Sequence, residues 1–179
     1  MNNTESPLWE IWEPIEIGNF KSIKELEEAI KNKNIMDNIA KSILESSKFT
    51  LSKVNKEVNL VIVSLDDLSH MSRNSAFYNS YDRICELAFK KGLKFCPDET
   101  CFQICLQSKK LLGSLELSIA MEPIYSKSNK EFNIFHISHW KNEDKSIIYG
   151  IPAYLKEDSK KYKFKFRSCE RFNKFIFCT

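Results

Sequence analysis

The chain has 179 residues, of which 42% are hydrophobic and 28% are charged, and its formal net charge is +3. This length is enough to bury one core without metals or disulfides, and the composition excludes wholesale disorder, a coiled coil and a collagen-like chain. With only four glycines and no apolar run of about 18 residues, glycine-rich nucleotide fingerprints and helical membrane spans are also excluded.

The first elements are an edge strand and a helix. Residues 9–17 have apolar side chains on one face of a predicted strand, and Pro14 assigns that strand to a sheet edge because proline cannot donate to a ladder. Ser22 and Glu25 have the spacing of a capping box, and the apolar residues that follow it predict a helix near 22–32.

A second helix and a buried strand follow. Residues 35–44 carry the apolar stripe of a core-facing helix that Asp37 or Asn38 can cap. Residues 57–65 form an apolar run rich in β-branched residues, which predicts a central strand buried on both faces.

A third helix precedes a series of strands. The apolar spacing over 77–88 predicts an amphipathic helix that Gly92 ends. From 102 onward the apolar period changes to two, so 102–107 and 115–121 are predicted as antiparallel strands joined through Gly113. Further strands are predicted over 132–138, 146–150 and 161–167.

These elements predict an α+β fold, with three helices in the N-terminal half packed on a mostly antiparallel sheet. Without internal repeats or linker-like segments, we expect a single domain over residues 1–179, with 168–179 as a short C-terminal extension. Lys, Asn and Ile are abundant, as in proteins encoded by AT-rich genomes, so we expect a bacterial source. Residues 1–18 are acidic and lack the basic n-region of a signal peptide, so we expect a cytoplasmic protein with reduced thiols. Delivery by a secretion system that recognises other signals stays open.

Cysteines and histidines are the candidate catalytic residues. Cys96, Cys101 and Cys105 are spaced C-x4-C-x3-C, which matches neither structural zinc nor iron–sulfur patterns, so we expect no metal and no cofactor. A cysteine-dependent hydrolase or transferase would pair Cys96 or Cys101 with His136 or His139. These histidines are three residues apart and therefore point to opposite faces of a strand.

A basic stretch near the C-terminus is the candidate nucleic-acid contact. Lys161, Lys163, Lys165 and Arg167 alternate with three aromatic residues, so the charges share one strand face and are able to follow phosphates. The aromatic rings lie on the opposite face, where they cannot stack bases beside the charges. We therefore favour a strand with a buried aromatic face and solvated lysines.

Adjacent carboxylates are interpreted as surface residues. The pairs Asp66–Asp67 and Asp98–Glu99 are neighbours in sequence, and neighbours do not converge on one substrate in a helix or a strand. Glu122, just before Pro123, occupies a loop position of the kind that often carries function. One carboxylate does not make a mechanism.

Several segments in order resemble one known family. They are Trp9 with Ile15–Gly18, Lys21–Ser22, Phe49–Leu51, Glu57–Ser64, Leu93–Pro97 and Ile119–Ile124. This pattern resembles an uncharacterised family of small bacterial proteins that are often labelled helicase, and the resemblance implies a single domain. No Gly-x-x-x-x-Gly-Lys-Ser/Thr loop is present, so the sequence does not support that label.

The sequence contains no nucleophile–base–acid set with a known spacing, no phosphate loop and no regular metal motif. We therefore expect a small bacterial, non-catalytic binding protein that acts on another macromolecule, in the setting of a mobile element, a phage, an antitoxin or a delivered effector. A protein partner is expected rather than nucleic acid or a membrane. The sequence predicts no oligomeric state.

Overall fold

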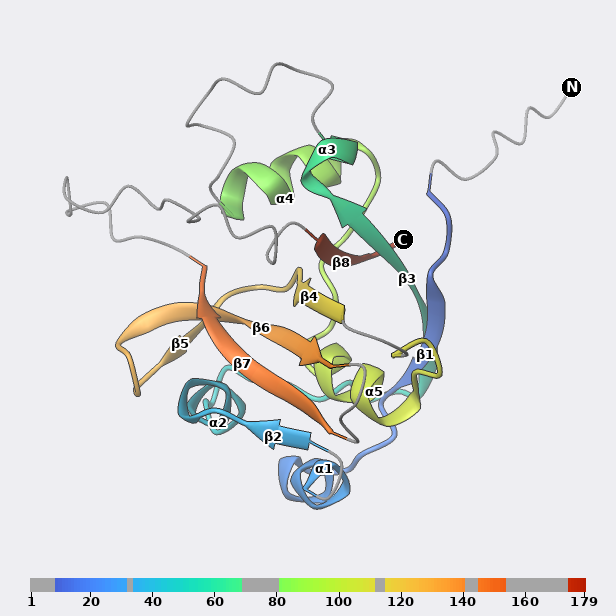
Figure 1. Ribbon diagram of the computed structural model, residues 1–179. Coiled ribbons are helices and arrows are strands. Elements are labelled where there is room, and N and C mark those ends of the chain that lie inside the picture. Colours follow the sequence, from blue (N-terminus) through green and yellow to red (C-terminus); the bar gives the residue numbers. More distant parts are fainter. Residues whose placement is uncertain (1–8, 32–33, 69–80, 112–114, 141–144, 154–173) are drawn as a thin grey trace, which may run out of the picture.

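The computed structural model describes residues 9–31, 34–68, 81–111, 115–140, 145–153 and 174–179 (Figure 1). Within these ranges the helices are α1 (Ile23–Ile30), α2 (Asn38–Leu44), the single turn α3 (Leu65–Leu68), α4 (Tyr81–Lys90) and α5 (Thr100–Gln107). The strands are β1 (Glu13–Ile17), β2 (Asn34–Met36), β3 (Lys56–Ser64), β4 (Leu115–Ile119), β5 (Ile124–Ser126), β6 (Glu131–His139), β7 (Ser146–Pro152) and β8 (Lys174–Cys178). The predicted α+β class is confirmed, but the expected number of three helices is wrong.

One mostly antiparallel sheet runs through the molecule in the order β1-β3-β8-β4-β6-β7-β2, and β5 pairs with β6. The pairs β4–β8 and β2–β7 are parallel. Strand β1 lies at one edge, as Pro14 predicts, with Pro14 opposite Asn59 of β3. Its outer side is covered by a side chain: Glu16 N–H donates to Gln107 Oε1 at 2.9 Å, and Gln107 Nε2 donates to Glu16 O at 2.7 Å.

The end of the chain lies inside the sheet. Strand β8, within the segment that we expected to form an extension, pairs antiparallel with β3 and parallel with β4. Phe175, Ile176 and Phe177 are buried in the core. The last strand therefore joins the first half of the sheet to the second half.

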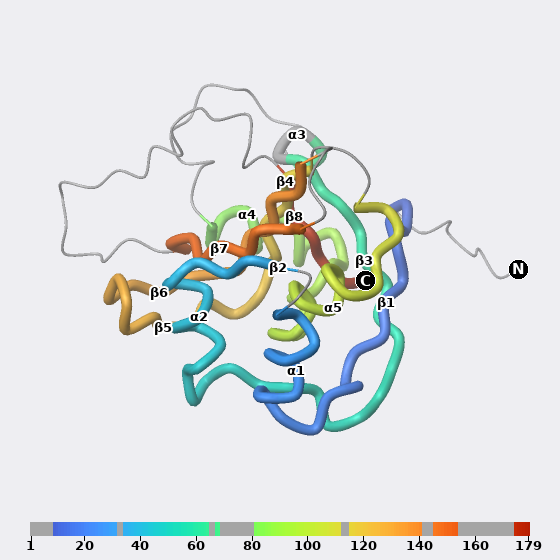
Figure 2. The backbone as a smooth tube through the Cα atoms, turned by 60° about the horizontal axis from the view of Figure 1, so that its bottom comes forward, coloured from blue at the N-terminus to red at the C-terminus, as the bar shows by residue number. Residues whose placement is uncertain are grey.

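Helices cover both faces of the sheet (Figures 1 and 2). Tyr81 at the start of α4 lies 6.3 Å, between ring centroids, from Phe175. On the opposite face, Phe102 of α5 lies 4.9 Å from Phe135 of β6. Helix α2 also lies on this second face, where a side chain at Gly150 would meet α2. Helices therefore cover a buried apolar layer on each side of the sheet.

Local signals at the helix ends act as predicted. Ser22 Oγ accepts from Glu25 N–H at the start of α1, and Asp37 Oδ1 accepts from Ala40 N–H at the start of α2. After α4, Gly92 has a φ of 84°, and Leu93 N–H donates to Ala88 O at 3.1 Å. This closure is a Schellman motif, which satisfies carbonyl groups that the helix leaves without a partner.

The strand predicted over 102–107 is wrong, because these residues form α5. Phe102 and Ile104 are buried as an alternating strand requires, but Cys101 before them and Gln103 between them are buried too. A short segment buried on nearly every side has no reliable period. The predicted pairing of this segment with 115–121 therefore does not form, and β4 pairs with β6 and β8 instead. The strand predicted over 161–167 lies outside the described residues.

Candidate functional site

The two candidate thiols are buried in different surroundings. Cys101 lies fully buried in α5, and burial raises its pKa well above the usual range. Cys96 lies in the loop after α4, donates to Ile176 O at 3.4 Å, and also has a raised pKa because of burial. A thiol with a raised pKa stays protonated at neutral pH, which is the weakly nucleophilic form.

The two candidate histidines both lie in β6 and bond to serines of neighbouring strands. His136 Nδ1 lies 3.1 Å from Ser118 Oγ of β4, and His139 Nδ1 lies 3.1 Å from Ser146 Oγ of β7. Burial lowers the pKa of His136 to about 4, so its imidazole is neutral at pH 7. Since they are three apart in one strand, the two rings point to opposite faces.

The candidate residues therefore meet other partners rather than one another. Cys96 contacts β8, Cys101 lies fully buried in α5, and each histidine contacts a serine. Among the described residues, no group of three or more His, Cys, Asp or Glu side chains is placed to hold a metal ion. Lys161, Lys163, Lys165 and Arg167 lie outside the described part of the chain.

A buried polar cluster surrounds His136 on one sheet face. Ser138 Oγ donates to Glu116 Oε1 at 3.5 Å, and Tyr149 of β7 has its ring 6.4 Å from the His136 ring. Ser118, His136 and Ser138 are all buried. A neutral imidazole beside a serine hydroxyl is able to accept its proton, but burial leaves this pair no open approach for a substrate. The cluster acts as a polar part of the core.

Glu99 is a buried acid that the sequence does not reveal. Its side chain is fully buried, and its carboxylate accepts from Gly18 N–H at 3.2 Å, from Ser52 N–H at 2.8 Å and from Gln103 Nε2 at 2.9 Å. The interpretation of Asp98–Glu99 as solvated surface is wrong for Glu99. Carboxylates that accept several hydrogen bonds fix their donors in place, so this one ties two loops to α5.

A pair of thiols brings together segments that are distant in sequence. The Sγ atoms of Cys96 and Cys178 lie 3.5 Å apart, although the two residues are 82 positions apart in the chain. Cys178 is the last residue of β8. Spacing arguments compare cysteines with their close neighbours in sequence, so they do not detect this pair, which we call the dithiol.

The β5–β6 hairpin presents two exposed aromatic rings. Tyr125 and Phe132 are register partners, are 41% and 49% exposed, and have ring centroids 5.6 Å apart in an edge-to-face arrangement. We call them the exposed ring pair. The opposite side of the hairpin is fixed, because Ile124 is buried and Ser42 Oγ of α2 accepts from Lys127 N–H at 2.9 Å. The hairpin lies at one end of the molecule, beside α2 (Figure 2).

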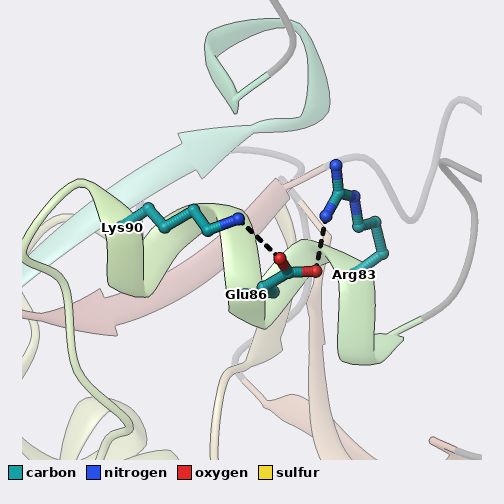
Figure 3. Close-up of polar contacts among 3 residues, drawn as sticks. All are labelled: Arg83, Glu86 and Lys90. Carbon is teal, nitrogen blue, oxygen red and sulfur yellow. Dashed lines mark hydrogen bonds and ion pairs between the residues drawn. The ribbon is translucent and has the colours of Figure 1, made fainter.

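The outer surface of α4 is charged and has satisfied ion pairs (Figure 3). Glu86 pairs with Lys90 at 2.6 Å and with Arg83 at 2.5 Å. Hydrogen bonds from Lys90 and Arg83 lower the pKa of Glu86 to about 2. Such i, i+3 and i, i+4 pairs are ordinary features of exposed helices, so this surface is not a candidate site.

The described helices include none that combines the length and the apolar character needed to cross a membrane. Comparisons of the chain with family models, with curated proteins and with solved structures gave no match.

Proposed function

We propose that this chain is a small bacterial, non-catalytic binding protein that acts on another protein, and that the exposed ring pair is its contact surface. The observation that carries the proposal is the exposure of Tyr125 and Phe132 together on a hairpin whose other side is fixed to α2. Aromatic side chains that are held rigidly lose little entropy on binding and are enriched among residues that dominate interface energies.

The residues around the ring pair indicate the chemistry of the partner. Lys127 and Lys130 are exposed in the turn of the hairpin, and Glu131 is the one acidic residue between Ile124 and Phe132. A complementary protein surface would offer an apolar recess for the rings and carboxylates near the two lysines.

A protein partner fits the ring geometry better than a nucleic acid does. Tyr125 and Phe132 meet at an interplanar angle of 69°, so the edge of one ring covers part of the face of the other. Base stacking requires open and accessible ring faces. An edge-to-face pair instead offers a compact apolar knob, which is suited to a recess.

The alternative of a cysteine-dependent hydrolase or transferase needs a thiolate at Cys96 or Cys101. Burial raises the pKa of both thiols, which opposes that requirement. The proposal includes a bacterial cytoplasmic setting, where thiols remain reduced, and membership of the family of small bacterial proteins that the sequence resembles.

The test is affinity capture from nuclease-treated lysate of the source cells, quantified by mass spectrometry. The double variant Tyr125→Ser/Phe132→Ser removes the exposed ring pair. Val54→Ser is the matched control, because Val54 is 68% exposed and lies in a loop outside the hairpin. We expect wild type and Val54→Ser to retain the same protein in equal amounts. The double variant should retain at least about tenfold less of that protein, as is typical when a hot spot of an interface is removed.

Three results would contradict the proposal. The first is equal retention by the double variant, provided that its circular dichroism matches the wild type. The second is retention that occurs only in a parallel lysate without nuclease, which would favour a nucleic-acid partner. The third is added mass from a small ligand in native mass spectrometry with no protein retained, because that result would identify a small-molecule site.

A further inference from the structure

The dithiol joins two segments that the backbone already holds in register. Lys94 N–H donates to Cys178 O at 2.8 Å, and Cys178 N–H donates to Lys94 O at 3.0 Å. Two residues further on, Cys96 N–H donates to Ala120 O at 2.7 Å. The two sulfur atoms are therefore positioned by main-chain bonds on both sides, and 3.5 Å separates them.

Little movement is needed to join the sulfurs. A disulfide has an S–S distance of about 2.05 Å, so the Sγ atoms would approach by about 1.5 Å. Rotations about the side-chain bonds are able to supply part of this change without moving the strand. Cys178 is also followed by the exposed residue Thr179, and Cys178 itself is 6% exposed. This small opening suits a small oxidant.

We propose that Cys96 and Cys178 form a redox site that a peroxide oxidises to an intramolecular disulfide. The Cys178 thiolate attacks one oxygen of hydrogen peroxide, the O–O bond breaks, and hydroxide leaves as Cys178 becomes a sulfenic acid. Cys96 sulfur then attacks Cys178 Sγ, and the displaced hydroxide takes up the thiol proton. In total, two thiols and one hydrogen peroxide give one disulfide and two waters.

The surroundings assign the first attack to Cys178 rather than to Cys96. The hydrogen bond with Cys96, together with the charges of Lys56 and Lys94, lowers the pKa of Cys178, although burial opposes this change. Burial and the neighbouring Cys178 raise the pKa of Cys96. One sulfur is thus the nucleophile and the other resolves the sulfenic acid.

Peptide mapping tests the proposal on the wild-type chain. Native protein is treated with hydrogen peroxide, its free thiols are alkylated, and it is digested with trypsin and a glutamate-specific protease. Cleavage after Glu99 separates Cys96 from Cys101 and Cys105 in the sequence. We expect a disulfide-linked pair of the peptides Phe95–Glu99 and Phe175–Thr179, which a reducing agent separates. The bond closes a long loop of chain, so we also expect oxidation to raise the thermal midpoint and reduction to restore it.

Variants separate this site from the other thiols. Cys96→Ala and Cys178→Ala should each abolish the linked peptide, whereas Cys105→Ala, in α5, should retain it. The result that overturns the proposal is wild-type protein in which peroxide leaves both peptides alkylated. A disulfide that joins Cys178 to Cys169, or Cys178 over-oxidised without a partner, would overturn it equally. The wild-type map decides even if a variant fails to fold.

Discussion

His136 is a buried base whose protonation is coupled to folding. Burial lowers its pKa from 6.5 to about 4, so the unfolded chain binds a proton in this window and the folded chain does not. The free energy of unfolding must therefore fall as the pH falls from 6.5 toward about 4, and this one group accounts for a loss of about 3 kcal/mol at the lower end.

We expect His136→Asn to remove this pH dependence, because asparagine has no titrating group and keeps a polar atom near Ser118 Oγ. The measurement is the free energy of unfolding by urea for both proteins between about pH 7 and about pH 4.5, where the difference arises. Asp98, whose pKa burial raises, has the opposite slope but is present in both proteins. Equal slopes for the two proteins would contradict the expectation.

At the residue scale, the sequence predicts the type of candidate but not its partners. The sequence predicts the opposite orientation of His136 and His139, because that orientation follows from their spacing in a strand. The sequence does not predict the partners of Glu99, because Gly18 is 81 positions away and Ser52 is 47 positions away. The same reason hides the dithiol, whose sulfurs meet only after β8 enters the sheet.

At the scale of elements, local signals are reliable and burial patterns are less so. The caps at Ser22 and Asp37 satisfy backbone groups within four residues, so the sequence states them directly. The segment that forms α5 has no such cap, since Glu99 at its start makes no capping bond and turns to loop donors. Its alternating apolar residues reflect burial on several sides, which favoured the wrong prediction of a strand.

Gly92 offers a clean test of a helix end. Its φ of 84° lies in the left-handed region, and no atom lies within 4 Å of where a Cβ would stand, so steric contacts do not contribute. We expect Gly92→Ala to reduce the free energy of unfolding by about 1–2 kcal/mol, the cost of that conformation for an L-residue. Gly92→Asn should lose less, because asparagine tolerates this region. If urea unfolding gave the same loss of unfolding free energy for both variants, or no loss for either, the left-handed conformation of Gly92 would not be the source of the effect.

At the scale of the molecule, the order of the strands depends on the chain's last residues. Helix and strand positions are largely readable from local periodicity, but which strands become neighbours is decided by contacts between distant segments. Strand β8 lies between β3 and β4, more than 50 residues from either in the sequence. The sequence predicts its short apolar run as part of an extension. In the structure, the sheet would be divided into two parts without this strand.

Deletion of residues 174–179 should therefore prevent folding rather than trim the protein. Phe175, Ile176 and Phe177 are buried, each contributes about 2 kcal/mol or more on burial, and β3 and β4 would also lose ladder partners. That loss is comparable with a total stability of about 5–15 kcal/mol. We expect the deleted chain to show collapsed amide dispersion in NMR spectra, whereas deletion of Thr179 alone should preserve the native spectrum. A deleted chain with native dispersion would mean that the two halves of the sheet hold together without β8.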